Sequence, residues 1–402
     1  MSGHDILYVG AYSDDTAPGG VYVVRSSDGG RDLRLEQHLP APDQAGYLVL
    51  HPDAERLYAV DERKTDGRGP VGAPAAVHSF AVDRNGRLTP TGVEPAFGAF
   101  PTYLSLAPEH ALLFAVSHGS FDHVERVVRD PKTGWRTEFV YDDSTVVAYD
   151  LSLNGDIERV ADVQVLTGHG MDPNHSPQAG GHGQASSHAH CGVVDPSGRY
   201  LLVADKATDR IYVFQIGRPL QLVSTFQALP ETGPRHLAFA STASRIVVTY
   251  EFSSEVAALD FDAANGALTE TSVITTLAGP IDRVNEPADI RVHPNGRTVY
   301  VNNRGEDAIA WFSLTADGVL RREGDLPLTP SIHPGLAARS VAVSPQGDYL
   351  VVADRPAGLL RSYAIAPDGA LTATTTLHIP GAAFVCATRA SFDDAPIEQV
   401  SL

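Results

Sequence analysis

The chain has 402 residues and a formal net charge of −19 at pH 7. This length is enough for two or three domains of ordinary size. The excess of acidic residues excludes nucleic acid and anionic membranes as expected partners, because both need a basic protein face. An anionic substrate would therefore need a local basic pocket.

The cysteines and the N-terminus indicate an intracellular protein. Cys191 and Cys386 lie far apart in apolar, strand-like runs, which favours buried thiols over a disulfide. The N-terminal run MSGHDILYVGAYS lacks the positive segment and long apolar stretch of a signal peptide. No apolar run approaches the length that spans a bilayer. We expect the protein to be cytoplasmic.

Short apolar runs rich in Val, Tyr, Leu and Ile recur along the chain, bounded by Gly, Pro, Asn or Asp. Such runs are typical of strands joined by turns. A repeat of roughly forty to fifty residues with four strands is typical of propeller blades. Six copies of its first strand, turn and second strand begin at Tyr47, Tyr103, His190, His236, Ala288 and Arg339.

The two ends of the chain supply a seventh copy. The N-terminal run DILYVGAYSDDTAPGGVYVV has the pattern of the later strands of a blade, and AAFVCATRA, from Ala382, has that of the missing inner strand. Pairing them would remove the open edge that a sheet-rich protein must otherwise protect. We therefore predict an all-β, seven-bladed β-propeller, a single domain over residues 1–402, closed by strands from both termini.

Three segments interrupt the repeat spacing, near residues 63–76, 119–145 and 167–187. Each is rich in Gly, Pro or charged residues, and we predict loops inserted in the blades, where insertions often shape a binding surface. The run from His169 to His190 also holds five histidines: His169, His175, His182, His188 and His190. Their irregular spacing favours a glycine-rich lid over a metal site, and we expect no metal and no other cofactor.

Two positions stand out when the six copies are aligned on the turn between their first two strands. The position six residues before the turn holds Gly46, Thr102, His190, Arg235, Ala288 and Arg339. The position ten residues after it holds Glu62, His118, Lys206, Glu251, Arg304 and Arg355, with Tyr12 in the matching place of the N-terminal copy. In antiparallel pairing, the start of one strand and the end of the next lie at the same sheet edge. Both sets should therefore meet at one mouth of the central channel.

A polar ring at a channel mouth can be nothing more than a solvated surface. The first-strand positions argue against that interpretation here. A histidine and two arginines directly before buried inner strands (His190, Arg235 and Arg339) would be costly to bury unless they are paired or used. We interpret the set as a functional site.

The residue types suit the hydrolysis of an activated ester such as a lactone. Arginines bind carboxylate or phosphate and stabilise an oxyanion, while a histidine can deprotonate water near neutral pH. A glutamate can orient that histidine or act as a second acid–base group. No serine-centred elbow motif appears, so acyl-enzyme chemistry has little support.

Two motifs carry a resemblance to a known family. SHAH at Ser187 is similar to the Pro-His-Ala-His of the seven-bladed propeller lactonases, and GPRH at Gly233 has a Glu sixteen residues after its Arg, as in that family. This family includes the bacterial propeller-type 6-phosphogluconolactonases and the fungal carboxy-muconate cyclases, and the resemblance covers nearly the whole chain. It implies active-site positions at His190, Arg235, Glu251 and Arg304, a further family arginine at Arg339 and an acidic position at Asp289. Ser187 stands where the family usually has a proline.

We therefore expect a lactonase acting on a sugar lactone, with 6-phosphogluconolactone as the default substrate. The catalytic residues are expected to be His190, Glu251, Arg235 and Arg304. The substrate-binding residues are expected to be Arg339, Arg355, Asp289, His188, Lys206, Glu62, His118 and Tyr12.

Two other functions stay open on the sequence. A carboxymuconate-type cycloisomerase, which forms a lactone, needs the same residue types. A non-catalytic binding propeller would need none of them to converge. The expected partner is a small lactone or carboxylate, with no nucleic acid and no membrane, and the sequence leaves the oligomeric state open.

Overall fold

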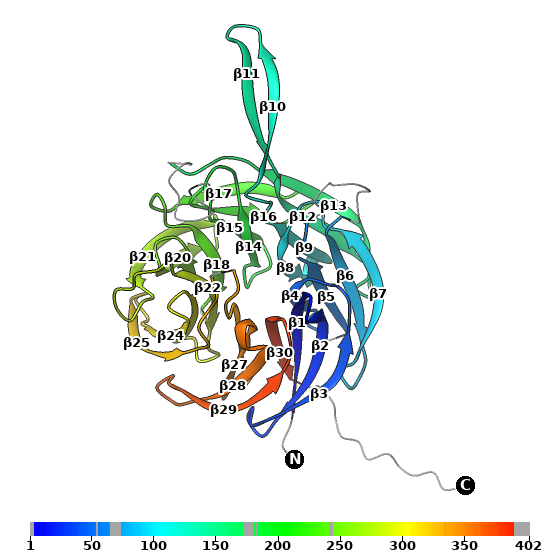
Figure 1. The fold of residues 1–402 in the computed structure, drawn as a ribbon, viewed down its shortest axis with the longest axis vertical. Helices are drawn as coiled ribbons and strands as arrows, with labels where there is room; N and C mark the ends of the chain where they lie inside the picture. Colours follow the sequence, from blue (N-terminus) through cyan, green and yellow to red (C-terminus); the bar gives the residue numbers. More distant parts are fainter. Residues whose placement is uncertain are drawn as a thin grey trace, which may run out of the picture.

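Seven four-stranded antiparallel sheets surround a central axis in the described part of the computed structural model (Figure 1). The structure describes residues 4–53, 55–64, 74–171, 181, 183–240, 244–333 and 335–389. The prediction of an all-β, seven-bladed propeller is confirmed. No helix in these ranges has the length and apolar character needed to cross a bilayer.

Each blade runs outward from the axis in chain order, apart from the blade that joins the two ends. The first blade comprises β4 (Ala45–Leu50), β5 (Arg56–Asp61), β6 (Ala76–Val82) and β7 (Leu88–Pro95). The second comprises β8 (Pro101–Ala107), β9 (Leu112–Ser117), β12 (Ser144–Leu151) and β13 (Ile157–Leu166). The third comprises β14 (Ala189–Val194), β15 (Tyr200–Asp205), β16 (Arg210–Gln215) and β17 (Gln221–Gln227). The next three comprise β18 (Pro234–Phe239), β19 (Arg245–Tyr250), β20 (Glu255–Asp262) and β21 (Ala267–Thr275); β22 (Glu286–Val292), β23 (Thr298–Arg304), β24 (Ala308–Leu314) and β25 (Leu320–Pro327); and β26 (Ser340–Val343), β27 (Tyr349–Asp354), β28 (Leu359–Ile365) and β29 (Leu371–His378). Two short 3₁₀ helices, η1 (Pro108–His110) and η3 (Arg355–Ala357), complete these blades.

Strands from both ends of the chain close the ring, as predicted. The seventh blade has the order β30 (Ala382–Arg389), β1 (Asp5–Ser13), β2 (Pro18–Ser27) and β3 (Asp32–Leu39). β1 pairs antiparallel with β30, so that Tyr8 lies opposite Cys386. The inner strands of neighbouring blades contact one another around the whole ring.

Burial falls from the inner strands to the outer strand of each blade. β15, with the sequence YLLVAD, is buried at every position because neighbouring blades cover both of its faces. β17, with the sequence QLVSTFQ, is mostly exposed because it forms the outer edge of the same blade. Cys191 is buried and Cys386 half-buried, and both are free thiols.

Tyrosines of the second strands join neighbouring blades. The Tyr8 hydroxyl donates to the carbonyl of Gly86 at 3.1 Å, and Tyr300 donates to Gly369 at 2.9 Å. Gly86 and Gly369 lie in the turns before the outer strands, with φ of 75° and 87°. Glycine adopts this left-handed conformation without the strain that a Cβ would add. The Gly-containing turns that mark the repeat thus also position the next blade.

The insertion near residues 119–145 differs from the predicted loop. It forms an antiparallel pair, β10 (His123–Asp130) and β11 (Gly134–Tyr141), which projects from the disc as an arm (Figure 1). Parts of the insertions near 63–76 and 167–187 lie outside the described residues.

Candidate functional site

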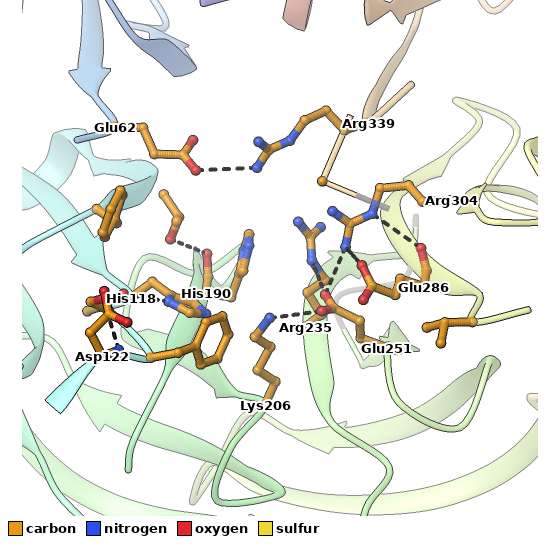
Figure 2. A pocket seen from close by; sticks show the side chains of 17 residues that line it. Glu62, His118, Asp122, His190, Lys206, Arg235, Glu251, Glu286, Arg304 and Arg339 are labelled. Carbon is orange, nitrogen blue, oxygen red and sulfur yellow. Dashed lines mark hydrogen bonds and ion pairs between the residues drawn. The ribbon is translucent and has the colours of Figure 1, made fainter. Parts of the chain in front are cut away.

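A cavity of about 570 Å³ opens at one mouth of the central channel (Figure 2). It lies where the innermost strands begin and the second strands end, the edge at which the sequence placed both polar sets. Its walls come from Glu62, Phe100, Thr102, His118, Gly119, Ser120, Phe121, Asp122, His190, Lys206, Arg235, Glu251, Val284, Glu286, Arg304, Gly335 and Arg339.

Glu251 is the centre of a buried cluster of charges. Its carboxylate accepts Lys206 Nζ at 2.8 Å and lies 3.4 Å from Arg304 Nη2, and it also pairs with Arg235 Nε. The Glu251 side chain is 0% exposed. Burial raises the pKa of this carboxyl group, but Lys206, Arg235 and Arg304 together lower it by more than burial raises it. The pKa of Glu251 therefore lies below its ordinary value. Glu251 is therefore a carboxylate that neutralises cations rather than a proton donor.

The cations around Glu251 are held by further contacts. Arg304 Nη2 lies 2.8 Å from a Glu286 carboxylate oxygen, and Arg235 Nη1 donates to the carbonyl of Ala288. Burial lowers the pKa of Lys206, while Glu251 opposes this shift. Burial also lowers the pKa of Arg235 to about 10, so this guanidinium is charged at neutral pH. The three cations therefore form a rigid, positively charged part of the cavity lining, and the carboxylates of Glu251 and Glu286 balance part of their charge.

A chain of contacts runs from Asp289 through His236 to His190. His236 Nδ1 lies 3.2 Å from Asp289 Oδ1, and His236 Nε2 lies 3.2 Å from His190 Nδ1. A carboxylate only accepts hydrogen bonds, so His236 donates from Nδ1, and because burial lowers its pKa to about 4 the neutral ring accepts at Nε2. His190 must then carry its proton on Nδ1. Its Nε2, on the opposite edge of a ring that lines the cavity, holds a lone pair.

Burial keeps the histidines near the cavity neutral. It lowers the pKa of His190 and His118 well below the ordinary value, with Arg235 adding to the shift for His190 and Lys206 for His118. Burial likewise lowers the pKa of His236 and His188 to about 4. Asp289 keeps its charge, since burial raises its pKa but Arg291 and His236 lower it to about 2.

A second polar cluster faces the first across the cavity. Arg339 Nη2 lies 3.4 Å from a Glu62 carboxylate oxygen (Figure 2). Arg339 Nη1 donates to the Tyr12 hydroxyl at 2.7 Å. The Tyr12 hydroxyl also donates to Glu62. Gly46 makes this arrangement possible, because a Cβ at that position would stand 1.9 Å from Glu62 Oε2.

The structure brings together most of the residues selected from the sequence. All four expected catalytic residues line the cavity, as do four of the eight expected substrate-binding residues. The members of this set are His190, Arg235, Glu251, Arg304, Arg339, Lys206, Glu62 and His118.

The other four lie outside the cavity lining. Asp289 stands behind His236, and the His188 ring stacks on His118 with centroids 4.5 Å apart. Arg355 begins η3, and its guanidinium lies 4.6 Å from the centre of the Tyr12 ring. Tyr12 is itself buried beneath Glu62 and Arg339. These four hold cavity residues in place instead of lining the cavity themselves.

The sequence argument missed several residues that the structure places in or next to the site. His236 directly follows Arg235, at a register shift between Pro234 and Leu237. Glu286 begins an inner strand, while Phe121 and Asp122 belong to the inserted segment and have no counterpart in the other copies. The motif GPRH contains His236, which was the available signal for it.

The histidine-rich run gives no metal site among the residues that the structure describes. His175 and His182 lie outside those residues, so the expectation of no metal stays untested for the run as a whole. The His169 imidazole contacts the Gly170 carbonyl at 2.6 Å.

Known proteins similar to this chain share its seven-bladed propeller fold. A family model described as lactonase, 7-bladed β-propeller, matches residues 6–387. The chain belongs to this lactonase family.

Relatives match over most of their length. A 6-phosphogluconolactonase of Formosa agariphila is 24% identical over 359 residues, covering 87% of this chain and 89% of the relative. A 6-phosphogluconolactonase of Bacillus subtilis is 23% identical over 359 residues, covering 88% and 89%. The solved structure of the Pseudomonas aeruginosa periplasmic gluconolactonase has a TM-score of 0.78 at 22% identity, covering 96% of this chain and 99% of that one. That last likeness shows a shared fold.

Proposed function

We propose that this lactonase-family propeller hydrolyses a sugar lactone by attack of a water molecule that His190 deprotonates. The observation that carries the proposal is the Asp289–His236–His190 chain, which ends at a histidine that lines the cavity together with three arginines. In the tautomer inferred above, His190 Nε2 is unprotonated. A neutral histidine accepts a proton from water as the oxygen attacks the carbonyl carbon. The names of the relatives support a lactone as the substrate.

The arginines suit the charge that develops in this reaction. Water attack turns the carbonyl oxygen into an oxyanion, which preorganised donors in a buried site stabilise. Arg235 uses Nε and Nη1 for its contacts with Glu251 and Ala288, and within the described part of the chain its Nη2 makes no hydrogen bond or ion pair. Collapse of the intermediate breaks the ring C–O bond, and the proton held by His190 passes to the leaving oxygen. The product is the open hydroxy acid.

The charge balance of the cavity bears on the substrate. Four cations (Lys206, Arg235, Arg304 and Arg339) face four carboxylates (Glu62, Asp122, Glu251 and Glu286) in the lining. To bind the phosphate of a phosphorylated lactone, one of these cations would have to leave the carboxylate with which it is paired in the lining. Arg339 is the best placed, because its side chain is 16% exposed and its contact with Glu62 is long, at 3.4 Å. We therefore assign the acidic or hydroxylated end of the substrate to Arg339.

The test is hydrolysis of δ-gluconolactone and 6-phosphogluconolactone by the purified protein, with carboxymuconate as a third substrate. We expect one or both lactones to be opened, and His190→Gln to lower kcat by about 10²- to 10⁴-fold because the general base is lost. His110→Gln is the matched control, since His110 lies in η1 at the far end of an inner strand.

Three results would count against the proposal. Consumption of carboxymuconate alone would indicate the cycloisomerase. Binding of lactones without turnover would indicate a binding propeller. Full activity of His190→Gln with loss of activity in His118→Gln would move the base to the second neutral histidine. The cytoplasmic location stays a prediction.

A further inference from the structure

The β10–β11 arm presents two different faces. Two residues that lie opposite each other in the paired strands point to the same face of the hairpin, and successive pairs alternate between the two faces. Every second pair, starting with His123–Tyr141 and ending with Arg129–Trp135, therefore lies on one face. This side, here called the aromatic face, consists of His123, Glu125, Val127, Arg129, Trp135, Thr137, Phe139 and Tyr141. The opposite face carries Val124, Arg126, Val128, Arg136, Glu138 and Val140.

The aromatic face leaves large apolar side chains in water. Val127 is 76% exposed, Trp135 71% and Phe139 55%. On the opposite face, Val124 is 62% exposed, while Val128 and Val140 are only partly exposed. An isolated two-stranded hairpin is at best marginally stable in water, and exposed apolar patches of this kind mark interaction sites. The arm therefore fits a surface that is covered by a partner.

The charges of the arm favour a second copy of the chain as that partner. The whole molecule carries a net charge of −19, which makes two copies repel. Residues 123–141 escape this excess, with four basic and three acidic side chains: Arg126, Arg129, Lys132, Arg136, Glu125, Asp130 and Glu138. Two acidic molecules can therefore approach through their arms.

We propose that the aromatic face pairs with the same face of a second copy about a two-fold axis through the Val127–Thr137 pair. Glu125 and Arg129 lie two residues on either side of Val127 in β10, so the axis sets Glu125 against Arg129 of the second copy. Trp135 and Phe139 lie two residues on either side of Thr137, so each meets the other across the axis. The face is thus self-complementary in charge and shape, as an isologous interface requires.

The size of the face sets the strength of the dimer. An aromatic side chain offers about 200 Å², so Trp135 and Phe139 together expose on the order of 250 Å² per copy. A standard interface needs about 800 Å² per partner. We therefore expect a dimer that dissociates on dilution.

The test uses charge reversal and sedimentation velocity of the full chain, from roughly 1 to 100 µM. The natural protein should shift from monomer to dimer over this range. Glu125→Arg places two arginines against each other, and Arg129→Glu places two glutamates against each other, so each variant alone should stay monomeric. The double variant should dimerise again. An equal mixture of the two single variants should form a heterodimer, because each copy then offers the charge that the other needs.

The control is Arg126→Glu on the opposite face, which should dimerise like the natural protein. Unchanged far-UV circular dichroism would show that each variant has folded. A natural protein that stays monomeric at every concentration would overturn the proposal. So would single variants that dimerise normally, a mixture that stays monomeric, or an Arg126→Glu variant that fails as the face variants do.

Discussion

Replacing Glu251 by glutamine tests whether its carboxylate holds the buried cations together. The substitution keeps the shape of the side chain and removes its charge. At an effective dielectric of about 20, a unit-charge pair at the 2.8 Å distance to Lys206 is worth about 6 kcal/mol, and one at the 3.4 Å distance to Arg304 about 5 kcal/mol. The cost of burying the carboxylate offsets much of this gain. Removing one partner of a buried ion pair costs about 3–5 kcal/mol, which is the expected loss in the free energy of unfolding.

Urea unfolding followed by far-UV circular dichroism measures this loss. The pH dependence adds a second readout that depends on Lys206. Burial lowers the pKa of Lys206 and Glu251 raises it, so Glu251→Gln should lower it further. A lysine with a lowered pKa binds fewer protons in the folded state than in the unfolded state. Stability therefore rises with pH up to the unfolded pKa of about 10.4, and the deficit of the variant should narrow above pH 7.

Two results would refute this reasoning. A loss below about 1 kcal/mol would show that the carboxylate is not needed to balance the cations. A deficit that is constant from neutral pH to about pH 10 would show that Lys206 is not the group left unpaired. Glu138→Gln is the control, because its contact with Arg136 at 3.5 Å joins exposed side chains, and its loss should stay within about 0.5 kcal/mol.

Two further predictions concern the histidines. His236→Phe should lower kcat by about 10²-fold or more with little change in KM, because His190 loses the partner that fixes its tautomer. His236→Gln can donate to Asp289 and accept from His190, so it should recover part of the rate. Equal rates for the two variants would contradict this positioning role. The free energy of unfolding should fall as pH drops from about 6.5 to about 4. Over this range His188 and His236 are protonated in the unfolded chain but stay neutral in the folded state, where their pKa values are about 4. Each can contribute roughly 3 kcal/mol over this window, and urea unfolding that gives the same stability at both ends would contradict it.

The phase of the repeat was sufficient to predict eight of the seventeen residues that line the cavity. Glu251 and Arg304 come from different blades, yet Glu251 directly follows the second strand of its blade and Arg304 ends the second strand of the next. Because every blade has the same strand order, residues at equal offsets reach the same mouth of the channel. This argument needs no knowledge of side-chain contacts, and so it works from the sequence alone.

The same argument could not find His236. In a regular strand, successive residues point to opposite faces, so Arg235 and His236 should not serve the same site. The pairing of β18 with β19 is irregular between Pro234 and Leu237, and such bulges re-aim side chains. The arm was missed for a different reason, since it occurs once and repeat comparison says nothing about a segment without a counterpart.

The pairing of β1 with β30 makes the cavity a property of the closed ring. Its walls come from residues as distant in sequence as Glu62 and Arg339, which meet over the Tyr12 side chain of β1. A chain that has formed six blades but has not yet joined its ends already contains every residue of the site and still lacks the site itself. Catalytic activity in this molecule should therefore require the C-terminal strand to dock beside the N-terminal one.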